Sequence, residues 1–242
     1  MKTITDNLSI SLLELLSVLL PGGTFLFFLN ELGAFENFEL SQQNEWVKGI
    51  VYFGLSYFLG YVIYVVSSPL DNLYDKIKRK ALKLDTKNGA KKELQLLSSD
   101  AIKCSFYNIL FPHLVVTHNL IVKVVEFKNR DIGSDLDGYK HQIIDAYQYS
   151  YRRLMAEELT MFAEVERYFG TARFFRCMTI VLGIGAVIWL FNEGNISQTW
   201  WILCLSIISF FIFLNRWRKA NHVAFKNVII LEGLKKNKEV LK

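Results

Sequence analysis

The stretch that decides the fold is Gly49–Val66, GIVYFGLSYFLGYVIYVV, which has eighteen residues and no charge. A helix of that length rises ~27 Å, close to the ~30 Å hydrocarbon core of a bilayer. Ser67-Ser68-Pro69 follows, and then a segment rich in Lys and Arg. The stretch therefore predicts a transmembrane helix whose C-terminal end is held on one side of the membrane by positive charge.

The composition of the whole chain also indicates a membrane protein. Hydrophobic residues make up 52% of the 242 positions and gather into long blocks, whereas about 45–50% is usual for soluble domains. The net charge of +5 fits cytoplasmic loops rich in Lys and Arg. No nucleic-acid motif accompanies it, so direct nucleic-acid binding is not expected. The three cysteines share no short spacing, which argues against a disulfide framework.

The apolar blocks predict four transmembrane helices, at about residues 10–29, 47–66, 174–191 and 199–214. The loops between the paired blocks, 31–45 and 192–198, contain Glu but neither Lys nor Arg. In contrast, 71–92 and 215–242 each contain eight Lys or Arg residues. The positive-inside rule therefore places both termini in the cytoplasm.

We predict an all-α fold: a polytopic membrane protein with four transmembrane helices and a mainly helical cytoplasmic insert. Short helices are expected at about 90–97 and 100–110. Residues 113–127 are rich in Val and Ile, and their periodicity does not decide between a hairpin and a buried helix. The predicted domains are an N-terminal transmembrane pair, a cytoplasmic helical domain, a C-terminal transmembrane pair and a basic cytoplasmic tail, at 1–68, 69–173, 174–214 and 215–242.

A long helix is predicted to run from a capping box at Ser134–Asp137 without a break into the third span. Its packing face has a three-four spacing, with Glu158 as the polar member and Ile144, Tyr147, Tyr151, Leu154, Met161, Val165 and Tyr168 as the others. Gly170 is its one weak point. If the protein switches, this helix is the expected lever, and the candidate hinges are Ser68, Pro69 and a kink at Pro21.

Glu14 is the one acidic residue in a predicted span. We group it into a candidate polar seam, a row of polar side chains inside the membrane. The other members are Ser11, Ser17 and Thr24 of the same span and Tyr57 and Tyr61 of the second span. An acid inside a membrane is costly, which favours a seam that faces a pore or another subunit. The alternative is that Glu14 lies hydrated at headgroup depth. Arg176, near the cytoplasmic end of the third span, is expected to extend to the headgroups.

Basic residues beside the spans form a candidate lipid- or partner-binding patch: Lys76, Lys78, Arg79, Lys80, Arg216, Arg218 and Lys219. Anionic lipid attracts such residues by ~1 kcal/mol each; the alternative is a plain topogenic signal. The tail, 219–242, contains apolar residues at 228–231. It is read as an amphipathic helix on the membrane or on a partner, or else as a solvated tail with one apolar patch.

The chain contains none of the common catalytic or nucleotide-binding motifs, such as HExxH, GxSxG or GxxxxGK. His113 and His118 are five residues apart, which shares a face on neither a helix nor a strand, so a metal site is not expected. We therefore predict no catalytic residue, no cofactor and no enzyme activity.

The architecture combines a first span broken by Pro21-Gly22-Gly23, a second span that enters YVVSSPLDNLYDKIKRK, a helical insert, and a closing pair of spans after VERYFGTARFFR. In this the whole chain resembles the small four-span membrane proteins of bacterial anti-phage defence loci, such as the membrane subunit of Kiwa-type systems. The resemblance implies an oligomer in the bacterial inner membrane that senses infection or membrane disturbance together with a soluble cytoplasmic partner. It carries no functional residue over.

Three hypotheses about function follow. The first is a non-enzymatic sensor or effector, in which the cytoplasmic domain or its partner acts on the spans. The second is an oligomeric ion channel or transporter with Glu14 and the tyrosines of the second span along its path. The third is a membrane scaffold.

Overall fold

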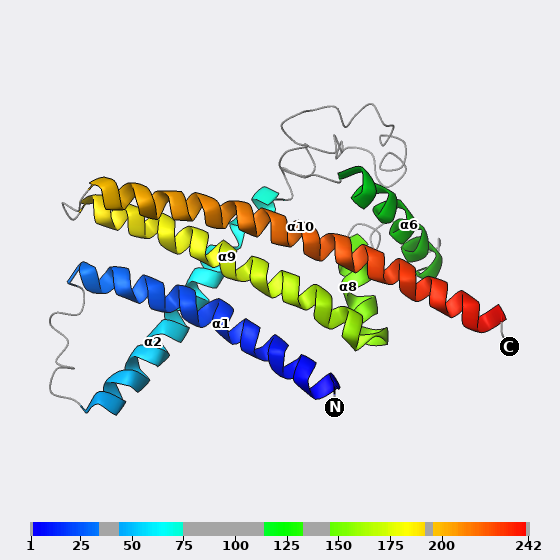
Figure 1. The fold of residues 1–242 in the computed structure, drawn as a ribbon, viewed down its shortest axis with the longest axis horizontal. Helices are drawn as coiled ribbons and strands as arrows, with labels where there is room; N and C mark the ends of the chain where they lie inside the picture. The colour runs from blue at the N-terminus through cyan, green and yellow to red at the C-terminus, as the bar shows by residue number, and fades with distance from the viewer. Residues whose placement is uncertain (1, 34–43, 75–113, 133–145, 192–195, 241–242) are drawn as a thin grey trace. The chain divides into compact units, whose positions relative to one another are not determined.

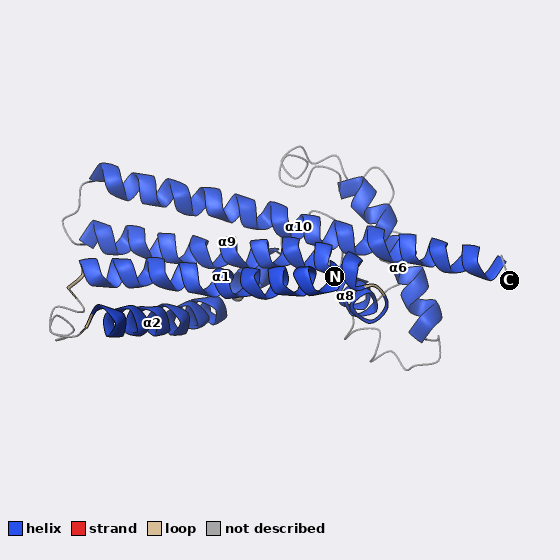
Figure 2. Ribbon diagram, turned by 60° about the horizontal axis from the view of Figure 1, so that its bottom comes forward, coloured by secondary structure: helices blue, strands red, loops and turns tan. Residues whose placement is uncertain are grey.

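The computed structural model describes residues 2–33, 44–74, 114–132, 146–191 and 196–240, and these residues contain helices and no strand (Figures 1 and 2). The all-α prediction is thereby confirmed for the described chain. The helices are α1 (Lys2–Glu31), α2 (Glu45–Val66), α6 (Leu114–Ile132), α8 (Ala146–Glu157), α9 (Leu159–Phe191) and α10 (Ile196–Val240). The helices expected at 90–97 and 100–110 and the capping box at 134–137 lie outside these residues.

Three helices of the described chain are long and apolar enough to cross a membrane: Glu45–Tyr74, Leu159–Phe191 and Ile196–Asn237. They contain the second, third and fourth predicted spans. The first predicted span lies in α1, which is not among the three. These three helices of the described residues are compatible with a membrane protein.

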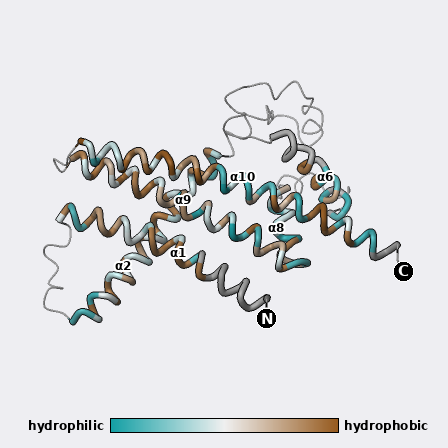
Figure 3. The backbone as a smooth tube through the Cα atoms, in the orientation of Figure 1, coloured by the Kyte–Doolittle hydropathy of each residue, from teal (hydrophilic) through white to brown (hydrophobic). Residues whose placement is uncertain are grey.

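The chain divides into two compact units. The apolar unit comprises Leu8–Leu73 and Phe169–Arg216, and the charged unit comprises Met1–Asn7, Tyr74–Tyr168 and Trp217–Lys242. Residues of α9 and α10 contribute to both. Figure 3 shows that each of these two helices is hydrophobic over one part of its length and more hydrophilic over the other.

In the apolar unit, α1 and α2 cross at small residues. A Cβ atom on Gly22 would lie 1.7 Å from the carbonyl oxygen of Ser56, and one on Gly60 would lie 2.0 Å from that of Val18. No side chain fits there, so glycine is required for this approach. Nearby, α1, α2 and α9 bury a small core of Phe28, Ile63, Cys177 and Val181.

The charged unit is built around a core from α6, α8, α9 and α10 that consists of Val124, Leu154, Val165, Ala224, Phe225, Val228 and Leu231. Two open questions are settled here. Residues 114–132 form a helix rather than a hairpin. The tail is helical, because α10 continues to Val240, and Val228 and Leu231 are buried in this core with Ile229 packed against it.

The long helix predicted to enter the third span is broken, which corrects that expectation. Helix α8 ends at Glu157 and α9 begins at Leu159, and Figure 1 shows the two helices running in different directions. At the break, the Oε1 atom of Glu158 accepts a 2.7 Å hydrogen bond from the hydroxyl of Thr160. Much of the predicted packing face keeps its role across the break, since Leu154 and Val165 belong to the core and Tyr147, Tyr151 and Met161 pack against it.

Candidate functional site

A pocket of about 350 Å³ lies in the apolar unit between α1, α2 and α9. Its lining residues come from one face of each helix: Glu14, Leu15, Ser17, Val18, Tyr57, Tyr61, Tyr64 and Arg173. The three tyrosines recur at steps of four and three residues, so they share a face of α2. That face ends at Ser67, where α2 terminates.

Glu14 and Arg173 supply the two charges of this pocket. Arg173 Nη1 lies 3.5 Å from Glu14 Oε1, longer than the ~2.7–2.9 Å of a strong charge-assisted hydrogen bond. The guanidinium of Arg173 also lies 4.0 Å from the ring centroid of Phe169, a cation–π distance. The side chain of Glu14 is 55% exposed and that of Arg173 is 19% exposed, so the carboxylate is the more accessible charge.

The predicted polar seam is assembled in part. Glu14, Ser17, Tyr57 and Tyr61 meet in the pocket, where the hydroxyl of Ser17 donates to the carbonyl of Glu14 at 2.7 Å. Thr24 is not in the lining, and its hydroxyl donates to the carbonyl of Leu20. The side chain of Ser11 lies outside the described residues. That the seam faces a pore or a subunit stays a prediction.

Sequence reasoning missed Arg173, which is the cationic partner of Glu14. It lay at the edge of the predicted cytoplasmic domain and had no pattern of its own. The signal that could have found it is the excess cost of an isolated acid in a span, which calls for a basic residue at the same depth on another helix.

Arg176 does not extend to the surface, which corrects the expectation for that residue. Its side chain is 3% exposed and forms an ion pair with Asp71. It also lies 4.8 Å from the ring centroid of Tyr64 and donates to the carbonyl of Tyr64 at 3.3 Å. The hydroxyl of Ser67 and the thiol of Cys177 are 3.5 Å apart beside it. Arg176 thus joins α9 to the C-terminal end of α2.

The hinge candidates lie in different surroundings. The helix that contains α2 is interrupted at Ser67 and Ser68 and resumes at Pro69, where the N–H of Leu70 donates to the carbonyl of Ser67 at 3.0 Å. Pro21 lies inside α1, is fully buried, and does not end the helix. Whether any of these positions moves stays a prediction.

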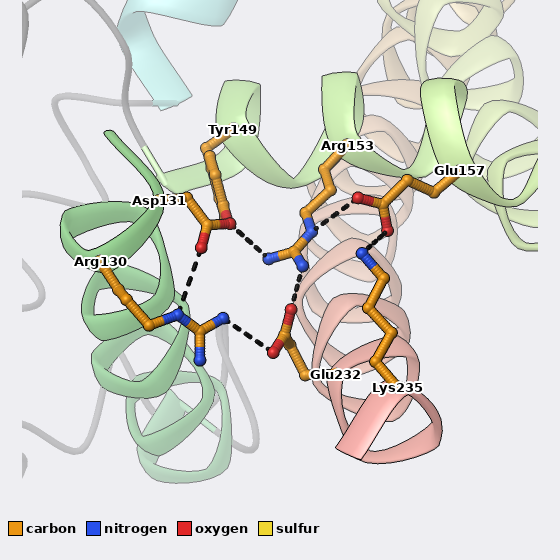
Figure 4. Close-up of polar contacts among 7 residues, drawn as sticks. All are labelled: Arg130, Asp131, Tyr149, Arg153, Glu157, Glu232 and Lys235. Carbon is orange, nitrogen blue, oxygen red and sulfur yellow. Dashed lines mark hydrogen bonds and ion pairs between the residues drawn. The ribbon is translucent and has the colours of Figure 1, made fainter. Parts of the chain in front are cut away.

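The charged unit contains a second polar cluster, which joins α6, α8 and α10 (Figure 4). Its members carry three positive and three negative charges and one phenol: Arg130, Asp131, Tyr149, Arg153, Glu157, Glu232 and Lys235. Arg153 is at the centre. It forms ion pairs with Asp131 at 2.9 Å, with Glu157 at 3.4 Å and with Glu232.

The outer members close this network. Arg130 Nη2 donates to Glu232 Oε2 at 2.8 Å, and Arg130 Nε contacts Asp131 Oδ1 at 3.3 Å. Lys235 Nζ lies 2.8 Å from Glu157 Oε2. The hydroxyl of Tyr149 donates a hydrogen bond to Asp131 Oδ2. Sequence reasoning did not find this cluster, because its residues are far apart in the chain and follow no motif.

Both carboxylates at the centre of the cluster have lowered pKa values. Burial favours the protonated form of Asp131, but the hydrogen bond from Tyr149 and the charge of Arg153 outweigh burial and lower its pKa. Burial acts in the same way on Glu232, and the hydrogen bond from Arg130 with the charge of Arg153 lowers its pKa. The two groups are therefore ionised near neutral pH and hold the cationic side chains in place.

The predicted basic patch is described only in its C-terminal half, since Lys76, Lys78, Arg79 and Lys80 lie outside the described residues. Arg216 and Arg218 are half-buried, whereas Lys219 is exposed with its Nζ 5.9 Å from the ring centroid of Tyr168. That this patch binds lipid or a partner stays a prediction.

Within the described residues, no group of three His, Cys, Asp or Glu side chains could hold a metal ion. In the part of the chain that the structure describes, two geometries are candidates for a function: the pocket around Glu14 and the ion network around Arg153. Comparisons of the chain with protein-family models, with curated proteins and with solved structures find no match.

Proposed function

We propose that this chain is a non-enzymatic sensor or effector of the bacterial inner membrane, in which a cytoplasmic helical unit is coupled to four transmembrane spans. The charged unit would be the cytoplasmic part and the apolar unit would contain the spans, with both termini in the cytoplasm. The protein would work as an oligomer with a soluble cytoplasmic partner.

The observation that supports the proposal is the sharing of α9 and α10 by both units. In α9, Val165 is buried in the core of the charged unit and Val181 in that of the apolar unit. In α10, Phe225 belongs to the first core, and Ile202 packs on the second. A signal that repacks the charged unit therefore acts on helices that also form the core of the apolar unit. This continuity is the physical link that coupling requires.

The coupling can be tested with the native cysteines of the full-length protein in lipid nanodiscs. Cys177 is buried in the core of the apolar unit, and Cys204 is exposed. The rate at which N-ethylmaleimide labels each thiol, measured by peptide mass spectrometry, therefore reports on the packing of the apolar unit. Arg153→Gln disturbs the charged unit and should speed the labelling of Cys177 several-fold. Arg152→Gln, an exposed neighbour, is the matched control and should leave it unchanged.

The same measurement separates coupling from a local effect. Two glycines inserted after Gly170 loosen α9 between the units, because glycine is a poor helix former. In that background Arg153→Gln should lose its effect on Cys177. If Arg153→Gln leaves Cys177 as slowly labelled as in the unsubstituted protein, the two units are not coupled and the proposal is wrong.

The cellular setting that we propose is anti-phage defence with a soluble partner. Purification in mild detergent should yield an oligomer with a bound cytoplasmic protein, measured by mass photometry. Expression of that pair in a bacterial host should lower the plating efficiency of at least one phage. A monomer without a partner, or plating that never changes, would contradict this part.

An oligomeric channel is the second candidate function, because the pocket brings Glu14, Tyr57 and Tyr61 together between helices. Ion flux into liposomes containing the protein would support it, and Glu14→Gln should then change the rate or selectivity of the flux. Flux that is absent, or that is indifferent to this substitution, would exclude this path.

A further inference from the structure

The pocket around Glu14 is lined on one side by tyrosines near the end of an apolar helix. Tyr57, Tyr61 and Tyr64 line its α2 side over the last three turns before the helix ends at Ser67. Seven residues of helix rise about 10 Å, so in a bilayer whose polar boundary lies at the end of α2 this row of tyrosines would cover about a third of the ~30 Å hydrocarbon core. Tyrosine is enriched at that boundary because its ring is apolar and its hydroxyl is polar.

The charges of the pocket are balanced. One carboxylate, from Glu14, and one guanidinium, from Arg173, lie 3.5 Å apart, longer than the ~2.7–2.9 Å of a strong charge-assisted hydrogen bond. A ligand with an ammonium and a phosphate separated by a short linker matches this arrangement. A net anionic headgroup would place its uncompensated charge beside the carboxylate of Glu14.

We propose that the pocket binds the headgroup of one phosphatidylethanolamine molecule. Its ammonium donates hydrogen bonds to the carboxylate of Glu14, and its phosphate accepts from the guanidinium of Arg173 and from tyrosine hydroxyls. The volume of about 350 Å³ is within the range of small-molecule sites. The acyl chains leave along the exposed side chains of Leu15 and Tyr57.

A primary ammonium fits better than the quaternary ammonium of phosphatidylcholine. A choline headgroup has no N–H to donate to Glu14, and proteins bind it in cages of aromatic faces. The rings of Tyr61 and Tyr64 instead stack on each other, with centroids 6.3 Å apart and an interplanar angle of 26°. They do not face a common centre as a cage would require.

The test uses the full-length protein in vesicles of equal parts phosphatidylethanolamine, phosphatidylcholine and phosphatidylglycerol. After extraction and washing in lipid-free mild detergent, native mass spectrometry counts the lipids that remain on the protein. We expect the ethanolamine lipid to be retained about tenfold over the choline lipid, equivalent to ~1.4 kcal/mol. Glu14→Gln should abolish this preference, and Tyr61→Phe, which keeps the ring, should reduce it.

Tyr52→Phe is the matched control, since Tyr52 is an exposed tyrosine of the same helix outside the pocket. It should retain lipid as the unsubstituted protein does. Equal retention of the three lipids, or a preference that survives both Glu14→Gln and Tyr61→Phe, would overturn the proposal. Displacement of the lipid by millimolar phosphoethanolamine would also overturn it, because the site would then bind a soluble phosphate ester. None of these outcomes depends on coupling between the two units.

Discussion

The ion network around Arg153 gives the sharpest prediction about the charged unit. The side chains of Arg153 and Glu232 are 8% and 7% exposed, and Arg153 also pairs with Asp131 at 2.9 Å. Arg153→Met removes the central cation and leaves the buried carboxylate of Glu232 and the partly exposed carboxylate of Asp131 without it. Breaking a buried ion pair in this way typically costs ~3–5 kcal/mol. Because Arg130 still pairs with Glu232 and Asp131, we expect the lower end, about 3 kcal/mol.

Hydrogen exchange of the full-length protein in nanodiscs measures this loss. A local destabilisation of about 3 kcal/mol speeds the exchange of protected amides in α8 by on the order of a hundredfold. Arg152→Met, at an exposed neighbour, should change exchange less than threefold. The double variant Arg153→Met, Glu232→Met removes one charge of each sign and should regain most of the protection. Equal exchange in Arg153→Met and Arg152→Met would refute the reasoning.

Two further predictions concern pH and helix crossing. The pKa values of Asp131 and Glu232 are lowered from 3.8 and 4.5. The stability that these two carboxylates contribute is therefore complete above about pH 5 and is lost as the pH falls through their pKa values in the folded protein. Amide protection of α6 should drop over that pH range, and an unchanged protection profile would contradict the lowered pKa values. Gly60→Ala places a Cβ 2.0 Å from the carbonyl oxygen of Val18 and should lower the free energy of unfolding by ~1–3 kcal/mol. Gly54→Ala is the control, because a Cβ there would have no atom within 4 Å and should leave the stability unchanged. Thermal unfolding in detergent compares the two variants, and equal melting temperatures would contradict the close crossing of α1 and α2.

The candidate site was predictable in its acidic half. Glu14 stood out because it interrupts an apolar block, and the helical spacing of Tyr57 and Tyr61 put those two side chains on one face. Arg173 did not stand out, because the register of α9 against α1 decides which basic residue reaches Glu14. The network around Arg153 had no sequence signal, since its members lie on three helices and meet only when those helices pack.

Local sequence also failed where a break depends on packing. Ser68-Pro69 marks an interruption by residue type, since proline cannot donate to the preceding turn. Glu158 carries no such mark, and the same apolar periodicity continues on both sides of it. The chain can separate α8 from α9 there because both helices still bury their apolar faces in one core.

The sequence by itself determined the helical class, the apolar blocks and the polarity of the loops, because these follow from length, hydropathy and charge along the chain. The tertiary structure decided three things: that the tail belongs to the core of the charged unit, that Arg176 pairs with Asp71 instead of extending outward, and that Glu14 meets Arg173. Each depends on contacts between residues distant in sequence, which are fixed by how the helices pack. The stretch Gly49–Val66 thus predicts a transmembrane helix from sequence alone, while helix packing makes its tyrosine face one wall of a pocket.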